Sequence, residues 1–443
     1  MRWPSSRSPY LALRHRDYRR LVASQLFSIT GSQMQTVAIN WHIYLLTRSP
    51  LALGFVGLTR VVPIVVFSLW AGVIADRYDR RRLMIASQLS MTAVALALGA
   101  LTVAHRETLL LIYALNFLSA AAGAFDNPAR NALIPRLVPM AQLPGALSLN
   151  FSVFQTAMIT GPALTGLILA GHTAALPAPG PGHAAALPSL AGLAVIYFLN
   201  AASFLAVIYA LATMRTSGAP EKGAGDAHPW TALKEGLRFV FTTPLMVWTM
   251  GLDFLATFFS GSMSLLPIFA DQVLHAGAKG YGVLASAPAV GALAGSLFLS
   301  LRPLPSRQGP LFLGSVAAYG AATVAFGLSR RFWLTLLALA AVGLADAIST
   351  VIRQTLRQLI TPDRLRGRMT SVNAIFFTGG PQLGELEAGL VASFFASAAV
   401  GVTVSVVSGG LVTVLITAVA AAVAPGVRRY DAREHLPRQW GQP

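Results

Sequence analysis

Apolar residues form runs of about 20 or more positions along the whole chain, and short polar segments separate the runs. Such a run is long enough to cross the hydrocarbon core of a bilayer as one α-helix. The pattern therefore predicts an all-α membrane protein with twelve transmembrane helices, in the ranges 21–46, 51–75, 83–104, 108–134, 143–171, 190–214, 244–272, 281–301, 310–329, 332–360, 368–396 and 399–424. The first run is too long for the core of a signal peptide, so we expect a retained helix.

Basic residues are unevenly shared between alternate connections. With both termini inside, the inside segments hold 24 of the 33 Lys and Arg residues and the outside loops hold five. This asymmetry predicts a multi-pass protein of the plasma membrane (the bacterial inner or cell membrane) with both termini cytoplasmic. The net charge of +17 comes from these loops, so we expect anionic lipid headgroups rather than nucleic acid as their partner.

Two long connections divide the chain. The uncharged segment 172–189 is expected outside, and the segment 215–243 is expected inside. We predict an N-terminal six-helix half (1–214), a cytoplasmic linker (215–243), a C-terminal six-helix half (244–424) and a cytoplasmic tail (425–443). A short interfacial helix is expected in the linker, because one face is apolar at Trp230, Leu233, Leu237 and Val240.

The two halves repeat each other at an offset of 223 residues. No gap is needed from the second span of each half to the fifth. Parallel repeats of six spans place a substrate cavity at their interface, near the middle of the membrane. The matched pairs are Gly54 and Gly277, Gly57 and Gly280, Gly72 and Gly295, Arg130 and Arg353, Leu133 and Leu356, Pro139 and Pro362, Ser148 and Ser371, Asn150 and Asn373, Gly161 and Gly384, Gly166 and Gly389, and Leu167 and Leu390.

The segment "GVIADRYDRRRL" between spans two and three resembles the signature loop of the major facilitator superfamily. The longer stretch "LTRSPLALGFVGLTRVVPIVVFSLWAGVIADRYDRRRLM", followed by "NPARNALIPRLV", resembles the branch that includes the enterobactin and macrolide exporters. The resemblance covers essentially the whole chain. It implies two six-helix bundles that work by alternating access, as a monomer and without a cofactor.

The resemblance also implies a conformational latch at the inside face. Asp76 would meet the positive N-terminus of span eleven, where an anion is favoured, and Gly72 would let these helices approach closely. The expected latch residues are Gly72, Asp76, Arg77, Arg80, Arg130 and Arg353. The alternative is a basic loop that only sets topology, which applies above all to Arg81 and Arg82.

Span five contains "TAMITGPALTG", which resembles the Gly-Pro motif of antiporters in this superfamily. Gly161, Pro162 and Gly166 would form an antiporter-type kink, since proline removes a backbone donor. This chain departs from the fuller pattern at Ala157. A kink without directional meaning is the alternative.

Five carboxylates fall well inside predicted spans: Asp126, Asp253, Asp346, Glu385 and Glu387. Ionisable groups in the apolar layer are costly and usually line a cavity or pair with one another. We take Asp126, Asp346 and Glu385 as candidates for proton coupling. The alternative is that Asp126 and Asp346 only pair with Arg130 and Arg353 and hold helices together.

The substrate cavity is expected to combine polar faces from several spans. Span one carries no acid but has polar residues spaced three or four apart. Asn116 stands where drug–proton antiporters of the superfamily often carry an arginine, which weakens the analogy with them. The expected cavity residues are Gln33, Thr36, Asn40, Asn116, Asp253, Phe254, Asp346, Asn373 and Glu385.

No catalytic or metal site is expected. The chain has no Cys, and its eight His residues do not fall at a metal-ligand spacing. We predict a secondary active transporter, a proton-coupled exporter of amphipathic small molecules such as a siderophore, a macrolide or a drug-like compound. The alternatives are an uptake permease for a metabolite, a membrane enzyme acting on lipid-borne substrates through Asp76 and Asp79, and a sensor without flux.

Overall fold

The computed structural model describes residues 9–174, 187–219, 229–301, 306–362 and 365–431. Within these ranges the chain is helical almost throughout and contains no strand, which confirms the all-α prediction. The physical reason is that a bilayer offers no water to backbone N–H and C=O groups, and a helix satisfies them internally. The predicted loop 172–189 and linker 215–243 lie partly outside the described residues.

Ten segments of the described chain are long and apolar enough to cross a membrane, and they match ten of the twelve predicted spans. The other two predicted spans, 21–46 and 368–396, fall on α1 (Arg16–Thr47) and α13 (Arg366–Ser393). With 32 and 28 residues these helices are long enough to cross, but their composition keeps them out of the ten apolar segments. Their polarity matters for the site described below.

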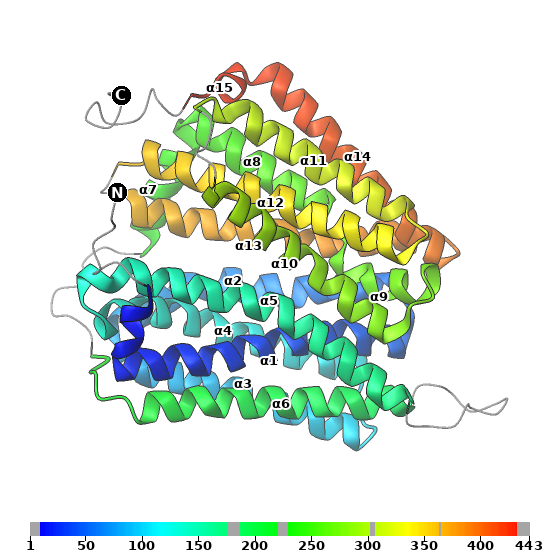
Figure 1. Ribbon diagram of the computed structural model, residues 1–443, viewed down its shortest axis with the longest axis horizontal. Helices are drawn as coiled ribbons and strands as arrows, with labels where there is room; N and C mark the ends of the chain where they lie inside the picture. The colour runs from blue at the N-terminus through cyan, green and yellow to red at the C-terminus, as the bar shows by residue number, and fades with distance from the viewer. Residues whose placement is uncertain (1–8, 175–186, 220–228, 302–305, 363–364, 432–443) are drawn as a thin grey trace. The chain divides into compact units, whose positions relative to one another are not determined.

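By their contacts the residues form two compact units, and the first comprises residues 1–47 and 59–226. In this unit α1 packs against α5 and α6, and α3 packs against α4 and α6 (Figure 1). Its other helices are α2 (Pro50–Arg77), α3 (Arg80–Val103), α4 (Leu109–Leu137), α5 (Leu143–Ala174) and α6 (Leu187–Ala212).

The second unit comprises residues 48–58 and 227–443, so the first turns of α2 are grouped with it. Here α13 packs against α8 and α14, and α11 packs against α12 and α14 (Figure 1). Besides α13, its helices are α7 (Pro229–Thr242), α8 (Pro244–Phe259), α9 (Leu266–Ile268), α10 (Gly277–Leu301), α11 (Gln308–Leu328), α12 (Phe332–Ile360), α14 (Ala398–Val423) and α15 (Pro425–Arg428).

Five pairs of neighbouring helices recur in the two units. The pairs α1–α5, α1–α6, α3–α4, α3–α6 and α5–α6 in the first unit correspond to α8–α13, α8–α14, α11–α12, α11–α14 and α13–α14 in the second. The correspondence follows the order of spans in each half. The sequence repeat therefore has a counterpart in the packing of each unit.

The seventh predicted span is broken, which the hydropathy pattern does not reveal. Helix α8 ends at Phe259, a 3-10 turn covers Met263–Leu265, and α9 leads into a π-helical turn at Phe269–Val273. Gly261 lies at the break, where a Cβ would come within 3.0 Å of the Cα of Gly384 in α13. Broken spans in transporters are typical of places where backbone groups face a bound ion or substrate.

The linker begins with a segment that is fastened to the first unit. The Asp17 carboxylate accepts hydrogen bonds from the backbone N–H groups of Arg215 and Thr216 at 3.0 and 2.9 Å, and from the Thr216 hydroxyl at 2.8 Å. The Gly218 carbonyl accepts from the N–H of Arg80, the first residue of α3, at 3.0 Å. We call residues 213–219 the linker strap.

Further along the linker, α7 coincides with the expected short helix. Val240 is buried in a cluster with Met246 and Met250 of α8 and with Met369 of α13. The apolar face of α7 thus packs in part against the second unit itself, and its position at a membrane surface stays a prediction. The side chains of Trp230 and Leu233 lie outside the described residues.

Candidate functional site

The second unit holds a buried guanidinium between two carboxylates. Arg353 of α12 forms an ion pair with Asp253 of α8, and their side chains are 1% and 9% exposed. A second carboxylate, Asp346, lies two turns earlier on α12, and its Oδ1 is 3.7 Å from Nη2 of Arg353. Asp346 differs from Asp253 in that 44% of its side chain is exposed.

Arg353 is further held by its own helix. Its Nε donates to the Ser349 carbonyl at 3.3 Å, and Nη2 donates to the Thr350 hydroxyl at 2.7 Å. A charged group this far from water is stable only where it is paired and hydrogen-bonded. The arginine is therefore a fixed part of the site, and Asp346 is its accessible part.

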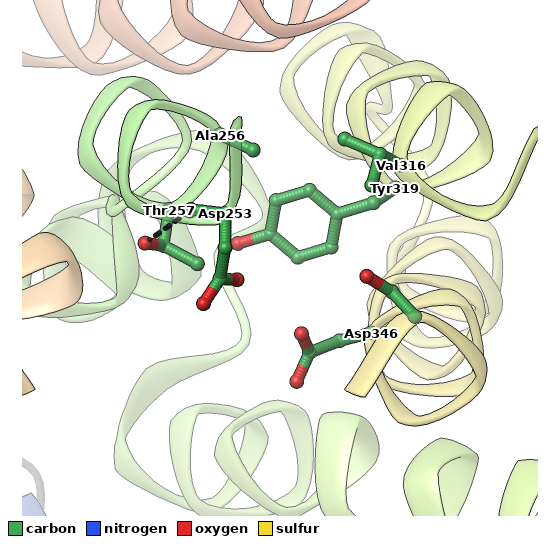
Figure 2. A pocket seen from close by; sticks show the side chains of 7 residues that line it. Asp253, Ala256, Thr257, Val316, Tyr319 and Asp346 are labelled. Carbon is green, nitrogen blue, oxygen red and sulfur yellow. Dashed lines mark hydrogen bonds between the residues drawn. The ribbon is translucent and has the colours of Figure 1, made fainter. Parts of the chain in front are cut away.

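These carboxylates line a small cavity in the second unit, with room for about one water molecule. Its walls come from α8, α11 and α12, and Figure 2 shows Tyr319 of α11 pointing its hydroxyl toward Asp253. The lining residues are Asp253, Ala256, Thr257, Val316, Tyr319, Asp346 and Ser349. Ala256 and Thr257 belong to the last turn of α8, directly before the break in the seventh span.

The other predicted cavity residues of the second unit lie near α13. Asn373 accepts a hydrogen bond from the buried guanidinium of Arg357, one turn beyond Arg353. Glu385 is 8% exposed and lies beneath the first turns of α2, where a Cβ at Gly57 would collide with the backbone of Gln382.

Phe254 stacks on Phe258 with ring centroids 6.0 Å apart, and it meets the edge of Phe376 at 5.9 Å. None of Phe254, Asn373 and Glu385 lines the cavity. The predicted cavity residues therefore do not all come together. Of those in the second unit, only Asp253 and Asp346 line the cavity.

In the first unit Asp126 of α4 is buried and has two partners. Gln88 of α3 donates to Oδ1 at 3.0 Å, and Nε of Arg130 lies 3.9 Å from Oδ2. Arg130 also hydrogen-bonds the side chain of Asn127. The neutral amide of Gln88 is therefore closer to the Asp126 carboxylate than the guanidinium of Arg130 is.

The polar face of α1 is divided between the interior and the surface of the first unit. Asn40 is buried, and its Oδ1 has no hydrogen-bond partner among the described residues. Gln33 and Thr36 are half-buried. Asn116 of α4 donates to the Thr59 hydroxyl of α2 at 2.7 Å.

Gly161 and Pro162 are buried where α5 crosses α1. A Cβ at Gly161 would lie 2.5 Å from the Cβ of Gln33 and 3.0 Å from the Thr30 carbonyl oxygen. Helix α5 continues through Pro162 to Ala174, and Gly166 is also buried. Gly161 therefore allows α5 and α1 to approach each other closely.

The signature loop is described in part. Asp79 caps α3 by accepting from the N–H groups of Arg81 and Arg82 at 2.9 and 3.2 Å. Arg81 donates to the Ala212 carbonyl at 2.7 Å and to the Met214 carbonyl at 3.0 Å, and so contacts the C-terminus of α6. Of the predicted latch residues, the surroundings of Gly72 and the side chains of Asp76 and Arg77 lie outside what the structure describes.

Arg48 and Asp271 form an ion pair at 3.1 Å within the second unit. Arg48 has a positive φ of 51°, and Asp271 lies in the π-helical turn that follows α9. The two residues are 223 positions apart, which is the offset of the sequence repeat.

Sequence reasoning missed Tyr319, Gln88 and the break after α8. An aromatic or amide residue inside an apolar run has no distinguishing pattern, so no signal pointed to the first two. The run "SGSMSLLP" with its glycine and proline could have indicated the break. Within the described ranges, no group of three or more His, Asp or Glu residues could hold a metal ion.

A family model described as "Transmembrane secretion effector" matches residues 7–177 and 176–443. The chain is 24% identical over 392 residues to the Staphyloferrin A transporter of Staphylococcus aureus, which covers 84% of this chain and 89% of that protein. It is 26% identical over 360 residues to the Enterobactin exporter EntS of Shigella boydii, with 81% of each chain covered.

Among solved structures, the fold resembles a bacterial homologue of the human lysosomal transporter Spinster. The TM-score is 0.71 at 14% identity, with 96% of this chain and 99% of that chain covered. A bacterial homologue of the iron transporter ferroportin gives a TM-score of 0.65 at 17% identity, with 91% and 98% covered. At these identities the likeness shows the fold alone.

Proposed function

The chain belongs to the transmembrane secretion effector family of the major facilitator superfamily, and on this premise we propose that it exports amphipathic small molecules in exchange for protons. The family and the relatives make it a multi-pass membrane protein and a secondary transporter. The direction, the coupling ion and the substrate are the proposed part. Siderophores, macrolides and drug-like amphipaths are the candidate substrates.

The observation that carries the proposal is the Asp253–Arg353–Asp346 cluster beside the cavity of the second unit. Charged groups inside the apolar layer are costly, and in transporters they mark ion and substrate pathways. Asp253 and Arg353 compensate each other in a nearly closed site, whereas Asp346 is exposed to the cavity. Asp346 is therefore our first candidate for the group that binds and releases the coupling proton.

Two other carboxylates are secondary candidates. Asp126 holds a hydrogen bond from Gln88 and a more distant arginine, so its charge is compensated within the first unit. Glu385 is buried under the start of α2. Both are less accessible than Asp346, and we propose that they support the helix packing and modulate coupling.

We propose that the polar face of α1 contacts the transported molecule. Gln33 and Thr36 are half-buried and can offer hydrogen bonds without a fixed charge. We also retain as proposals the boundaries of the two halves, the cytoplasmic position of both termini, the contact of the basic loops with anionic lipids, the monomeric state, and the latch at the signature loop.

Reconstituted vesicles with an imposed pH gradient test the function. Export of a labelled amphipath should require the gradient, and Asp346→Asn should abolish the dependence on it. Glu387→Gln provides a control that removes a carboxylate of α13 which does not line the cavity. Transport at an equal rate without the gradient would contradict proton coupling, and accumulation of the label against the proposed direction would indicate an uptake permease.

A further inference from the structure

We propose that Arg60 of α2 binds an anionic group of the exported molecule, a carboxylate. This inference rests on the proposed export function and deepens it by assigning a charge to the substrate. Among the candidate substrates, it selects amphipaths that carry a carboxylate.

The first observation is the place of Arg60 along α2. It is the only charged residue between Pro50 and Ala75. It follows Pro50 by ten residues, a rise of about 15 Å, which is about half the thickness of the hydrocarbon core of a bilayer. A charge at this depth of a span is costly, and such residues mark substrate or ion pathways.

The second observation is the side of α2 on which Arg60 lies. The apolar residues Phe55, Val62, Val65 and Val66 are exposed and share one side of the helix. With 3.6 residues per turn, Arg60 lies about 160° from Val62 and about 140° from Val65 around the axis. The arginine is therefore directed away from the exposed apolar side and into the protein.

The third observation is a nitrogen of this guanidinium that is buried without a partner. Nη2 of Arg60 is shielded from solvent and donates no hydrogen bond to another described residue. A buried donor that stays unpaired is costly, and the cost is larger for a charged group. Nη2 is therefore available to an acceptor from outside the described chain.

The acids of the first unit are engaged elsewhere. Asp17 accepts hydrogen bonds from the linker strap, Asp79 caps α3, and Asp126 accepts from Gln88. These are three of the four acids of this unit whose side chains the structure describes. Each of them therefore has a role that does not involve Arg60.

The remaining acids near α2 and α4 lie too far along their helices. Asn116 of α4 marks the level of Arg60, because its amide donates to the hydroxyl of the preceding residue, Thr59, at 2.7 Å. Glu107, the fourth acid, precedes α4 and comes more than two helical turns before Asn116. Asp76 follows Arg60 by 16 residues on α2, a rise of about 24 Å. A bound anion can supply the missing negative charge.

The surface next to Arg60 suits an amphipathic anion. On the face of α4 that carries Asn116, two turns further, a Cβ at Gly123 would meet no atom within 4 Å, so the space beside this face is open. Phe67, two turns after Arg60 on the same face of α2, packs against Phe125 of α4 with ring centroids 5.9 Å apart. The arginine, the open space and the aromatic pair together offer a charge, room and apolar surface.

The chemistry of the guanidinium favours a carboxylate. Its N–H donors form a planar fork that matches the two oxygens of a carboxylate. A carboxylate carries one charge, which a single guanidinium neutralises. A phosphate monoester carries about −1.5 to −2 at pH 7 and would leave part of its charge uncompensated in the apolar layer.

Equilibrium binding to the full-length protein in nanodiscs of zwitterionic phosphatidylcholine tests the proposal. Neutral lipid is needed because anionic lipid would repel carboxylates and attract amines. The probes are 4-phenylbutanoate, 4-phenylbutanol and 4-phenylbutylamine, which share a skeleton and differ in the head group. At pH 7.5 the acid is ionised and the amine is protonated, since such groups titrate near about pH 4.3 and about pH 10.4.

The carboxylate should bind about 10- to 100-fold more tightly than the alcohol, as expected for a hydrogen bond between charged groups. The amine should bind no better than the alcohol. Arg60→Gln should remove the preference for the carboxylate and leave binding of the alcohol unchanged, which also shows that the variant is folded. Arg60→Lys should keep part of the preference, because it retains the charge and loses the fork.

Two further variants locate the site. Arg106→Gln removes the same charge from an exposed position of the first unit and should keep the preference for the carboxylate. Gly123→Leu fills the open space beside α4 and should weaken binding of all three probes by a similar factor. Unchanged binding in Gly123→Leu would overturn the placement of the ligand beside Arg60.

Equal or tighter binding of the amine would overturn the proposal, and so would a preference for the carboxylate that survives in Arg60→Gln. Loss of alcohol binding in Arg60→Gln would show that the arginine only holds the fold, and would also overturn it. Glu385 packs against Gly57, one turn before Arg60 on α2. A preference that is absent from the wild type and appears in Glu385→Gln would show that Glu385 occupies the arginine, contrary to the proposal.

The assay uses no gradient, so it separates this inference from the proposed function. Carboxylate binding together with export that ignores the pH gradient would refute only proton coupling. Export that depends on the pH gradient, without a preference for the carboxylate in binding, would refute only the role of Arg60.

Discussion

Replacing Gly161 by alanine is expected to destabilise the first unit, because α5 and α1 cross at this residue without room for a side chain. The new Cβ would lie 2.5 Å from the Cβ of Gln33, whereas ordinary van der Waals contact begins near 3.4 Å. The helices would have to separate by about 0.9 Å, the difference between these distances. Backbone atoms of Thr30 and Met34 are also within 3.2 Å and cannot rotate away.

Overpacking of this kind costs about 1–3 kcal/mol, while replacing a helical glycine by alanine returns about 0.5–1 kcal/mol. Since the obstructing atoms include backbone, we expect a net loss of about 1–2.5 kcal/mol for Gly161→Ala. Gly171, on the same helix, has no atom within 4 Å of the corresponding Cβ. Gly171→Ala should therefore keep the helical gain and stabilise the protein slightly.

The assay is thermal unfolding in detergent micelles, followed by the fluorescence of the tryptophans. Trp41 of α1 is 5% exposed and should report on the separation of α1 from α5. The two variants should shift the unfolding temperature in opposite directions. If Gly161→Ala proves as stable as Gly171→Ala, the close approach is not the role of Gly161, and an antiporter-type kink at Pro162 would become the better explanation.

Three further outcomes are expected. Arg353→Gln should destabilise the second unit by about 3–5 kcal/mol, because it leaves the buried carboxylate of Asp253 unpaired. Asp253→Asn should cost less, because Asp346 lies 3.7 Å from the guanidinium of Arg353 and compensates it in part; the double variant should lose less than the sum, and an additive loss in thermal unfolding would contradict the pairing. Burial raises the pKa of Asp17, but the hydrogen bonds from the linker strap outweigh it and lower the pKa from 3.8 overall. The strap should therefore stabilise the protein above pH 3.8 and lose this effect as the pH falls through the lowered pKa. Asp17→Asn should unfold at a lower temperature than the wild type at pH 7, and the two unfolding temperatures should become equal in acid. Arg81→Gln should loosen the end of α6 and speed proteolysis in the linker, whereas Arg82→Gln, which changes an exposed neighbouring residue, should not. Equal proteolysis of both variants would indicate that Arg81 only sets topology.

Much of the fold followed from the sequence, because a bilayer forces apolar runs into helices. The two helices that hydropathy alone does not support, α1 and α13, carry the polar positions expected for a substrate path. The break after α8 was missed because hydropathy averages over the whole run and is insensitive to where backbone hydrogen bonds stop. Its glycine and serines were visible in the sequence, but such residues also occur in unbroken transmembrane helices.

The ionisable residues of the site could be found one by one but not paired. Asp253, Asp346 and Arg353 each stood out as charged positions inside an apolar run. That Arg353 pairs with Asp253, which precedes it by a hundred residues on another helix, depends on the packing of α8 near α12. Tyr319 joined the site only through that packing, because a tyrosine in an apolar span has no signal of its own.

The ion pair of Arg48 with Asp271 has a consequence for the origin of the chain. Residues at equivalent positions of two repeats meet only near the axis that relates the repeats, where a residue of a symmetric dimer contacts its own copy. Two identical halves would place like charges together there. An opposite pair can form only after the two copies have diverged, so this contact is one that a symmetric dimer of either half alone could not make.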